Sequence, residues 1–358
     1  MNNYIPFLKL KVNEVGALKA LTADIKKNGI VPFFDLAKKE GMTTSSFQQM
    51  VKKAVTSLSR NLSGIDAFFL DNFDIDDHIV VNKQNNYGFV IEEFSKMNFI
   101  PVVGLDRVAG RNQLVFDYKR QGNIKSNAIA IRLLVEDFES FELVRDEIGN
   151  LLDQGHELFS DWILILDNRV CMNVDVTERV KLLVQFLEDS IGIFDFDSVI
   201  ITGSSIPSSI RDVLAVNKSN EQYARKELII YHMAAKNLDK FNLYLGDYTI
   251  VSPLYSDSNI PPEAMLNVTA PKIIYTHGWV HYINRGGAIK THTRGSLQYN
   301  DIANDLITKP FYRGMPYSFG DAFLYEKANN ISKGVTPSSI LKPTINTHIT
   351  YMIKDFVS

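Results

Sequence analysis

The chain has 358 residues, of which 45% are hydrophobic and 22% are charged, a composition typical of a globular protein that can bury a large core. Its net charge of −3 gives no overall attraction for nucleic acid or for an anionic membrane. The single cysteine, Cys171, excludes an internal disulfide framework and suits a reducing compartment, and we expect it to be a small, at least partly buried residue.

The first residues carry neither the basic start nor the long apolar core of a signal peptide. No run of residues approaches the ~18 apolar residues that a membrane-spanning helix needs. We therefore expect a soluble, cytoplasmic protein.

Eight short apolar runs recur along the chain, and most of them end in a charged residue or a glycine. They occupy residues 30–35, 67–71, 99–106, 127–132, 162–167, 198–203, 245–251 and 271–276. Helical spacing between the runs, with hydroxyl or carboxylate caps expected at Thr43 or Thr44, Asp137 and Thr177, predicts alternating strands and helices. Eight such units predict an α/β fold: a single (β/α)8 barrel resembling a TIM barrel.

The two ends of the chain fall outside this series. Residues 4–10 are short and apolar, and we expect them to cross the bottom of the barrel or to pair at an edge. After the last run the sequence becomes rich in Gly, His, Arg and aromatic residues. We predict a barrel-like domain over residues 1–285 and a C-terminal extension over residues 286–358 that packs on the barrel mouth.

Short motifs in fixed order along the chain resemble those of a known family. They are Tyr-Ile-Pro-Phe-Leu-Lys at 4–9, Val-Pro-Phe-Phe-Asp at 31–35, Gly-Asp-Tyr at 246–248, Trp279 followed by Arg285-Gly286, Ser-Phe-Gly-Asp at 318–321 and Asn-Thr-His-Ile-Thr at 346–350. Together they resemble the Beta protein family of bacteriophages and bacterial mobile elements, from residue 4 to about residue 353. Thr347 stands where the family motif has a first histidine, which argues against a metal site of two adjacent histidines.

The resemblance implies a setting in phage biology or in defence against phage, and it implies no particular reaction. It also marks Asp35, Asp247, Tyr248, Arg285, Asp321 and His348 as members of family-like motifs.

Charged residues at the ends of the predicted strands are the main candidates for chemistry. They are Asp35, Asp71, Asp106, Arg107, Arg132, Asp167 and Asp247. Strand ends converge on one rim of a barrel, where ligands and catalytic groups gather. Converging carboxylates can hold Mg²⁺ or Mn²⁺ or divide acid and base roles, whereas Arg132, Arg169 and Arg285 can hold a phosphate. The alternative is that these charges pair with one another and tie the loops together.

Four further features have both a functional and a structural interpretation. Asp247 is a rim ligand or the cap of a tight turn, with Tyr248 as an amphipathic wall. His348 is a general base or a hydrogen-bonded anchor of the tail. The pair His277 and His281 would need a third ligand to hold a metal, and the hydroxyls of residues 202–207 suit either an anion or a helix start.

Two function hypotheses follow. In the first, Asp35, Asp106, Asp167, Asp247 and His348 act as catalytic groups, and Arg132, Arg169, Tyr248, Arg285 and Asp321 bind a phosphate-bearing ligand, either a nucleotide or a nucleic-acid end, for metal-assisted hydrolysis. In the second, the protein is a non-catalytic scaffold that binds a partner protein through its C-terminal extension, whose aromatic and Arg residues suit an interface or stacked bases. Carboxylates that line an open pocket would favour the first; carboxylates held in ion pairs would favour the second.

Overall fold

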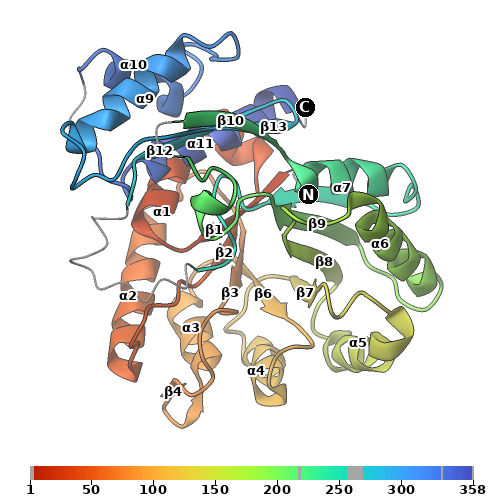
Figure 1. The fold of residues 1–358 in the computed structure, drawn as a ribbon. Coiled ribbons are helices and arrows are strands. Elements are labelled where there is room, and N and C mark those ends of the chain that lie inside the picture. The colour runs from red at the N-terminus through yellow and green to blue at the C-terminus, as the bar shows by residue number, and fades with distance from the viewer. Residues whose placement is uncertain (1–3, 217–218, 256–268, 332–333, 357–358) are drawn as a thin grey trace.

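A closed barrel of eight parallel strands forms the centre of the molecule (Figure 1). The computed structural model describes residues 4–216, 219–255, 269–331 and 334–356. Neighbouring strands follow the order β1 (Tyr4–Lys9), β11 (Leu243–Asp247), β9 (Ser198–Ser204), β8 (Asp161–Val170), β7 (Ala128–Leu134), β6 (Phe99–Val103), β3 (Phe68–Asp71) and β2 (Phe33–Asp35), which pairs again with β1. The predicted fold class is confirmed.

The identity of the eighth strand differs from the prediction. The segment at residues 4–10, expected to lie below the barrel or at an edge, supplies β1 and closes the barrel between β11 and β2. The predicted last barrel strand instead forms β12 (Lys272–His277) of a separate antiparallel sheet. Both segments are apolar runs of similar length, so local pattern could not decide which of them enters the barrel.

Helices surround the barrel, as the alternating pattern predicts. They are α1 (Val12–Lys19), the π-helix η1 (Ile25–Gly29), α2 (Thr44–Asn61), α3 (Asn86–Phe94), α4 (Ala109–Arg120), α5 (Phe141–Gly155), α6 (Val176–Ser190), the 3₁₀ turn η2 (Ile210–Asp212) and α7 (Lys226–Ala235). A short hairpin of β4 (Val80–Val81) and β5 (Gln84–Asn85) precedes α3. None of the described helices is long and apolar enough to cross a bilayer.

Of the helix caps expected from the sequence, one is confirmed and two are wrong. The Thr43 side chain accepts from the amide of Ser46 and caps α2. Asp137 instead accepts from the amide of Leu134, four residues before α5 begins. Asp175, and not Thr177, caps α6. Asp175 has an extended backbone just before the first turn of α6, which is the conformation of an N-cap residue.

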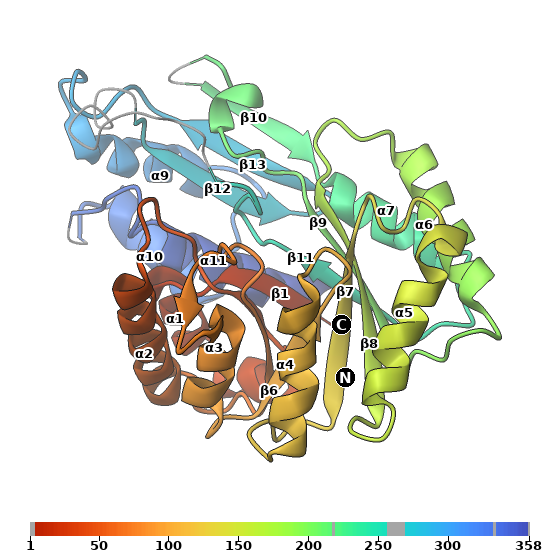
Figure 2. The same cartoon turned by 90° about the horizontal axis from the view of Figure 1, so that it is seen from below.

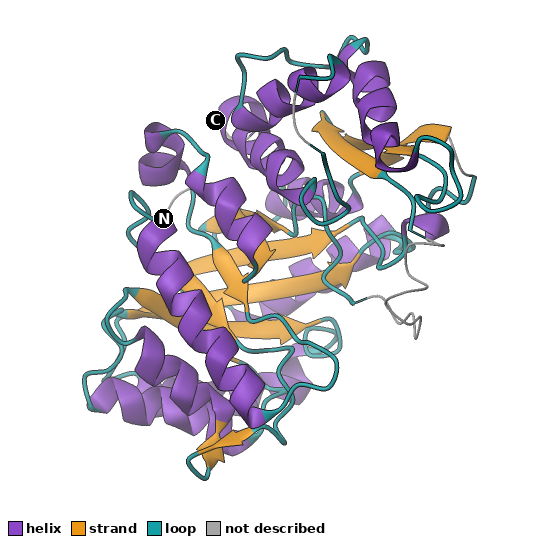
Figure 3. Ribbon diagram, turned by 90° about the vertical axis from the view of Figure 1, so that its left-hand side faces the viewer, coloured by secondary structure: helices purple, strands orange, loops and turns teal. Residues whose placement is uncertain are grey.

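The C-terminal part builds a second layer beside the barrel. Strands β10 (Ser219–Ala224), β13 (Val280–Arg285) and β12 form a three-stranded antiparallel sheet that lies apart from the barrel strands (Figures 2 and 3). The remaining elements are η3 (Gly295–Leu297), α9 (Gln298–Ile307), α10 (Phe319–Ala328), α11 (Leu341–Tyr351) and the π-helical turn η4 (Met352–Phe356). Helices α9 and α11 pack against β12. The division at residue 285 stays a prediction.

Alternation along the strands sets what enters the barrel. On β8, Ile163 and Ile165 pack in the barrel interior, whereas Leu164 and Leu166 pack in the larger core that contains helix side chains. On β7, Ala130 faces inward between Ile129 and Ile131, which belong to the outer core. The same alternation turns the next inward positions, residues 132 and 167, into the barrel above an apolar layer.

Candidate functional site

Arg132 lies at the centre of the barrel mouth. It is fully buried, and its Nη1 donates to Oδ1 of Asp35 at 2.8 Å and to Oδ2 of Asp71 at 2.9 Å. Its Nη2 donates to Oδ2 of Asp167 at 2.7 Å. Three of the carboxylates predicted at strand ends are therefore brought together, but around an arginine and not around an open space.

Further cations join Arg132 and these carboxylates at the barrel mouth, and the whole cluster is called the rim network. Arg107 and Arg111 both donate to Asp71, at 2.8 and 3.1 Å, and Lys9 donates to Asp35 and to Asp74. Burial alone would raise the pKa of the Asp35 carboxyl, but Arg132 and Lys9 hold that pKa well below its usual range. The carboxylate of Asp35 therefore stays charged inside the protein.

The rim network is electrically balanced. Its ion pairs join five carboxylates and five cations, which are Asp35, Asp71, Asp74, Asp106 and Asp167 with Lys9, Arg107, Arg111, Arg132 and Arg169. Asp106 sits at its edge, exposed and held by Arg107 at 2.5 Å. Equal numbers of opposite charges leave little net field to attract either an anion or a metal ion.

An aromatic side chain that the sequence analysis did not single out covers this network. The Phe73 ring lies 4.7 Å from the guanidinium carbon of Arg107, 4.9 Å from that of Arg132 and 4.8 Å from that of Arg169. The ring of Phe33 also lies near Arg132, 5.1 Å from its guanidinium carbon. The guanidinium of Arg132 therefore lies over two aromatic faces, an attractive cation–π arrangement.

Tyr248 and Arg169 join the rim network from two strand ends. The Tyr248 hydroxyl donates to Oδ2 of Asp167 at 2.5 Å and accepts from Arg132 at 2.7 Å and from Arg169 at 3.2 Å. Arg169 has a φ of 51°, stabilised because its amide donates to Oδ1 of Asp167 at 2.9 Å. Thr249, with a φ of 58°, donates in the same way to Asp247 at 2.7 Å. Both Asp side chains therefore shape turns, as a structural interpretation expects.

Asp247 belongs to a different network from the rim carboxylates. On β11, Tyr244 faces the barrel interior and Leu245 the outer core, so Asp247 points away from Arg132. Its Oδ1 accepts from the Tyr4 hydroxyl at 2.7 Å, and its Oδ2 accepts from Arg225 at 2.8 Å. Strand alternation therefore separates two aspartates that both end barrel strands.

His348 connects α11 to this second network. Its Nε2 lies 3.1 Å from both carboxylate oxygens of Asp247, and its Nδ1 lies 2.7 Å from the Thr276 hydroxyl. The order carboxylate–histidine–hydroxyl resembles a catalytic triad. All three residues are buried, however, and none lines the cavity between the barrel and the C-terminal part that is described below. The geometry is that of an anchor between the barrel and the C-terminal helix.

Two partners of the Asp247 network were absent from the sequence analysis. Arg225 and Glu227 are buried and lie 3.1 Å apart, and Glu227 accepts from the Ser205 hydroxyl at 2.5 Å. His281 lies 3.1 Å from the Thr276 hydroxyl and leaves its buried Nε2 without a hydrogen-bond partner. Burial and the neighbouring Arg225 lower the pKa of His281 well below its usual value.

Asp321 lies in a third place, between the small sheet and α11. It accepts from the hydroxyls of Tyr275 at 2.6 Å, Ser318 at 2.5 Å and Thr347. The Ser318 hydroxyl also caps α10 by accepting from the Asp321 amide. The family-like motif at 318–321 therefore fastens helices to one another and does not reach the barrel rim.

No described group of three or more His, Cys, Asp or Glu side chains has the arrangement of a metal site. His277 stacks on Phe311 with ring centroids 3.9 Å apart, whereas His281 points into the buried network at Thr276. The two histidines lie four residues apart on opposite sides of a hairpin turn, and antiparallel pairing places His277 opposite Val280. The structure therefore does not join them in one site.

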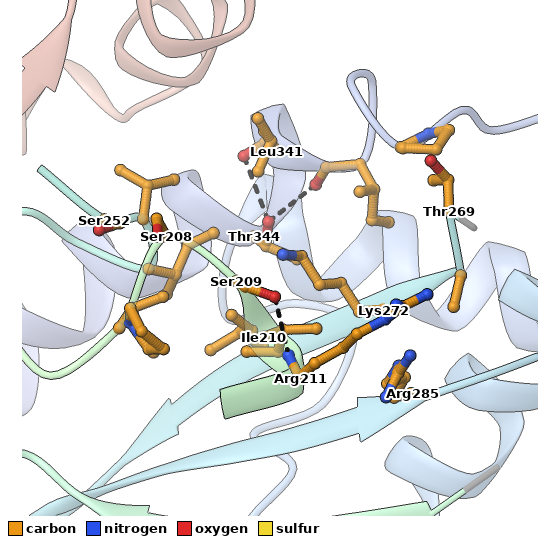
Figure 4. A pocket seen from close by; sticks show the side chains of 18 of the residues that line it. Ser208, Ser209, Ile210, Arg211, Ser252, Thr269, Lys272, Arg285, Leu341 and Thr344 are labelled. Carbon is orange, nitrogen blue, oxygen red and sulfur yellow. Dashed lines mark hydrogen bonds between the residues drawn. The ribbon is translucent and has the colours of Figure 1, made fainter. Parts of the chain in front are cut away.

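A cavity lies outside the rim network, between the barrel and the C-terminal part. It has a volume of about 450 Å³ and is walled by the segments after β9 and β11, by β12 and β13, and by the start of α11 (Figure 4). Arg211, Lys272 and Arg285 line it, and no described lining residue is an aspartate or a glutamate. Of the predicted site residues, only Arg285 reaches this cavity.

Arg285 is fixed at one side of the cavity. Its Nη1 donates to the backbone oxygens of Leu214 at 2.7 Å and Ala215 at 2.9 Å, and its buried Nε has no hydrogen-bond partner. Burial and the charge of Arg211 lower the pKa of Arg285, and burial and Arg285 lower that of Lys272. Sequence reasoning missed Arg211 and Lys272, because one lies on a loop turn and the other begins a strand that was assigned to the barrel.

Comparison with protein families agrees with the family resemblance of the sequence. The model of the Beta protein family matches residues 4–354, nearly the whole chain. No curated protein matches the sequence. The matched span includes β1 of the barrel and all of α11, and on this ground the chain belongs to the Beta protein family.

Proposed function

We propose that this member of the Beta protein family is a phage-associated protein, or one that acts in defence against phage, and that it binds a phosphate-bearing ligand in the cavity between the barrel and the C-terminal part. The observation that carries the proposal is the lining: three cations, Arg211, Lys272 and Arg285, and no acidic side chain among the described residues. A phosphate would offset the positive charges of Lys272 and Arg285.

The electrostatics of the cavity support an anion. The lowered pKa values of Lys272 and Arg285 each have a neighbouring cation among their causes. A bound anion would relieve this repulsion and would offer an acceptor to the orphaned Nε of Arg285. Hydroxyls of Ser208 and Ser209 also line the cavity and can donate to phosphate oxygens.

The rim network supports a structural role rather than hydrolysis. Every carboxylate in it is already paired with an arginine or a lysine, and Asp35, Asp71 and Asp167 are buried. A metal ion that bound these carboxylates would displace a buried guanidinium or ammonium group and leave that group without its partner. The proposed activity is therefore ligand binding, with residues 1–285 and 286–358 as proposed domains that both contribute to the cavity wall.

A second candidate is the scaffold function, in which the C-terminal part binds a partner protein. The supporting observation is a set of apolar side chains exposed on that part, which are Leu297, Met315, Phe319 and Tyr325. Aromatic residues and Met are enriched at protein interfaces.

Thermal unfolding with added ligands tests the proposal. Inorganic phosphate and AMP, each with and without Mg²⁺ or Mn²⁺, should raise the melting temperature. A ligand that binds only the folded state adds about 2.7 kcal/mol of stability when its concentration is 100 times Kd. Lys272→Met should reduce the shift, whereas Lys240→Met, an exposed lysine away from the cavity, should not. If no phosphate compound shifts the wild-type protein, the proposal fails and partner capture by the C-terminal part becomes the better hypothesis.

A further inference from the structure

The apolar part of the same cavity carries information about the ligand. More than half of its lining residues are aliphatic or proline, among them Ile206, Ile210, Ile250, Ile274, Ile340 and Leu341. These side chains come from loops of the barrel, from β12 and from the start of α11, so aliphatic surface is present on several sides. A volume of about 450 Å³ falls within the usual range of ligand pockets.

The polar side chains of the cavity are poorly suited to a nucleobase. A base is read by the Asn and Gln amides, which both donate and accept, and by the Asp and Glu carboxylates, which accept, and it stacks on aromatic rings. The described lining contains none of those four residue types, and Tyr299 is its one aromatic residue. Hydroxyl and cationic groups remain, and these suit phosphate oxygens.

The cations are gathered and do not line the whole wall. In Figure 4 the side chains of Lys272, Arg211 and Arg285 occupy the centre and right of the view, with Ser208 and Ser252 on the left. The electrostatic influence of Arg211 on Arg285, and of Arg285 on Lys272, agrees with this proximity. A ligand with charge at one end and hydrocarbon over the rest would match both regions.

We propose that the ligand is a phosphate monoester of an aliphatic alcohol, with its phosphate held by Lys272, Arg211 and Arg285 and its chain against the isoleucine-rich wall. This inference rests on the proposed phosphate-binding function and narrows its ligand class away from nucleotides. Each buried methylene of the ligand should add about 0.8 kcal/mol of binding free energy, or roughly a fourfold gain in affinity. The phosphate should fix the orientation of the ligand.

Titration calorimetry with inorganic phosphate, AMP, butyl phosphate and hexyl phosphate tests the inference. Hexyl phosphate should bind one per chain and roughly tenfold or more tighter than butyl phosphate, because two further methylenes are buried. AMP should bind no tighter than inorganic phosphate. Hexanol, which has the chain without the charge, should bind at least tenfold more weakly than hexyl phosphate.

Matched variants separate the chain site from the phosphate site. Ile210→Ser should weaken hexyl phosphate at least threefold and leave inorganic phosphate unchanged, whereas Lys272→Met should weaken both. Leu254→Ser offers a second chain-site variant at a half-exposed position that the fold tolerates more easily. Val216→Ser, at an exposed position that does not line the cavity, is the control.

The possible failures are distinguishable. Tighter binding of AMP than of hexyl phosphate would overturn the aliphatic class and leave the phosphate site standing. Equal affinity for butyl and hexyl phosphate would also overturn the aliphatic class, because the alkyl chain would then make no contact with the isoleucine-rich wall. Absence of binding by every phosphate compound would remove the proposed function itself.

Discussion

Arg132 donates from both Nε and Nη2 to a single oxygen, Oδ2 of Asp167, at 3.1 and 2.7 Å inside the closed barrel. Neither side chain is exposed to solvent. Since Arg132 also holds Asp35 and Asp71, the stability of the barrel mouth depends on one guanidinium that offsets several buried negative charges.

Replacement of that guanidinium should therefore be strongly destabilising. Arg132→Met keeps much of the side-chain volume but leaves buried carboxylates without their central cation, and we expect a loss of about 3–5 kcal/mol in the free energy of unfolding. Urea denaturation measures this loss. Arg120→Met, which breaks an exposed ion pair with Asp117, should change stability by no more than about 0.5–1 kcal/mol. Equal effects of the two variants would contradict the central role of Arg132.

Gly320 in the motif at 318–321 should tolerate no side chain. A Cβ at this position would lie 2.0 Å from the backbone oxygen of Pro343 and 2.9 Å from the Cβ of Thr347, so α10 and α11 would have to separate. Gly320→Ala should lower stability by about 2 kcal/mol or more in thermal unfolding, as overpacking does. Gly110→Ala, in α4 with open space around it, should instead stabilise by about 0.5–1 kcal/mol. Loss of stability in both variants would point to a general effect of the substitution.

Acidification should weaken the fold through its buried histidines. Burial and Arg225 lower the pKa of His281 well below 6.5, and burial also lowers that of His348 although Asp247 opposes the shift. The folded state therefore binds fewer protons than the unfolded state below pH 6.5, so stability is full above that pH and falls as the pH drops toward the folded pKa values. Each fully shifted histidine contributes at most about 1.4 kcal/mol per pH unit.

Urea unfolding at pH 7.5, 6.5 and 5.5 measures this dependence. His281→Asn keeps a polar group near Thr276 and removes the titration, so its stability should vary less with pH than that of the wild type. His156→Asn, at an exposed position, should retain the wild-type dependence. The pairing of Asp247 with His348 and Arg225 lowers its pKa despite burial, so its contribution is lost only in a separate, more acidic window. An unchanged pH dependence in His281→Asn would contradict the assignment.

Cys171 should be chemically inert in the folded protein. The residue is buried, and burial and the Glu227 charge raise the pKa of its thiol far above the usual value, so the reactive thiolate is scarce. A chromogenic disulfide reagent should label less than one-tenth of the thiol in native buffer and about one thiol per chain in denaturant. Fast stoichiometric labelling of the native protein would show that this region opens readily.

The sequence alone determined the fold class and the residues at the barrel mouth. Strand runs that alternate with helical spacing specify a parallel barrel, and the carboxyl ends of its strands meet at one rim. Asp35, Asp71, Arg132 and Asp167 were predicted together for that reason and lie together. The expected burial of Cys171 is likewise confirmed.

Tertiary structure decided three things that local pattern leaves open. It decided that Tyr4–Lys9, and not Lys272–His277, closes the barrel, because both runs are apolar and only packing chooses between them. It turned Asp247 away from Arg132, since a barrel strand is apolar on both faces and its sequence does not reveal which alternate side chains face inward. It also gathered Arg211, Lys272 and Arg285 around one cavity from loops and strands far apart in the chain. This proximity depends on the path of the whole polypeptide, which no short run of residues encodes.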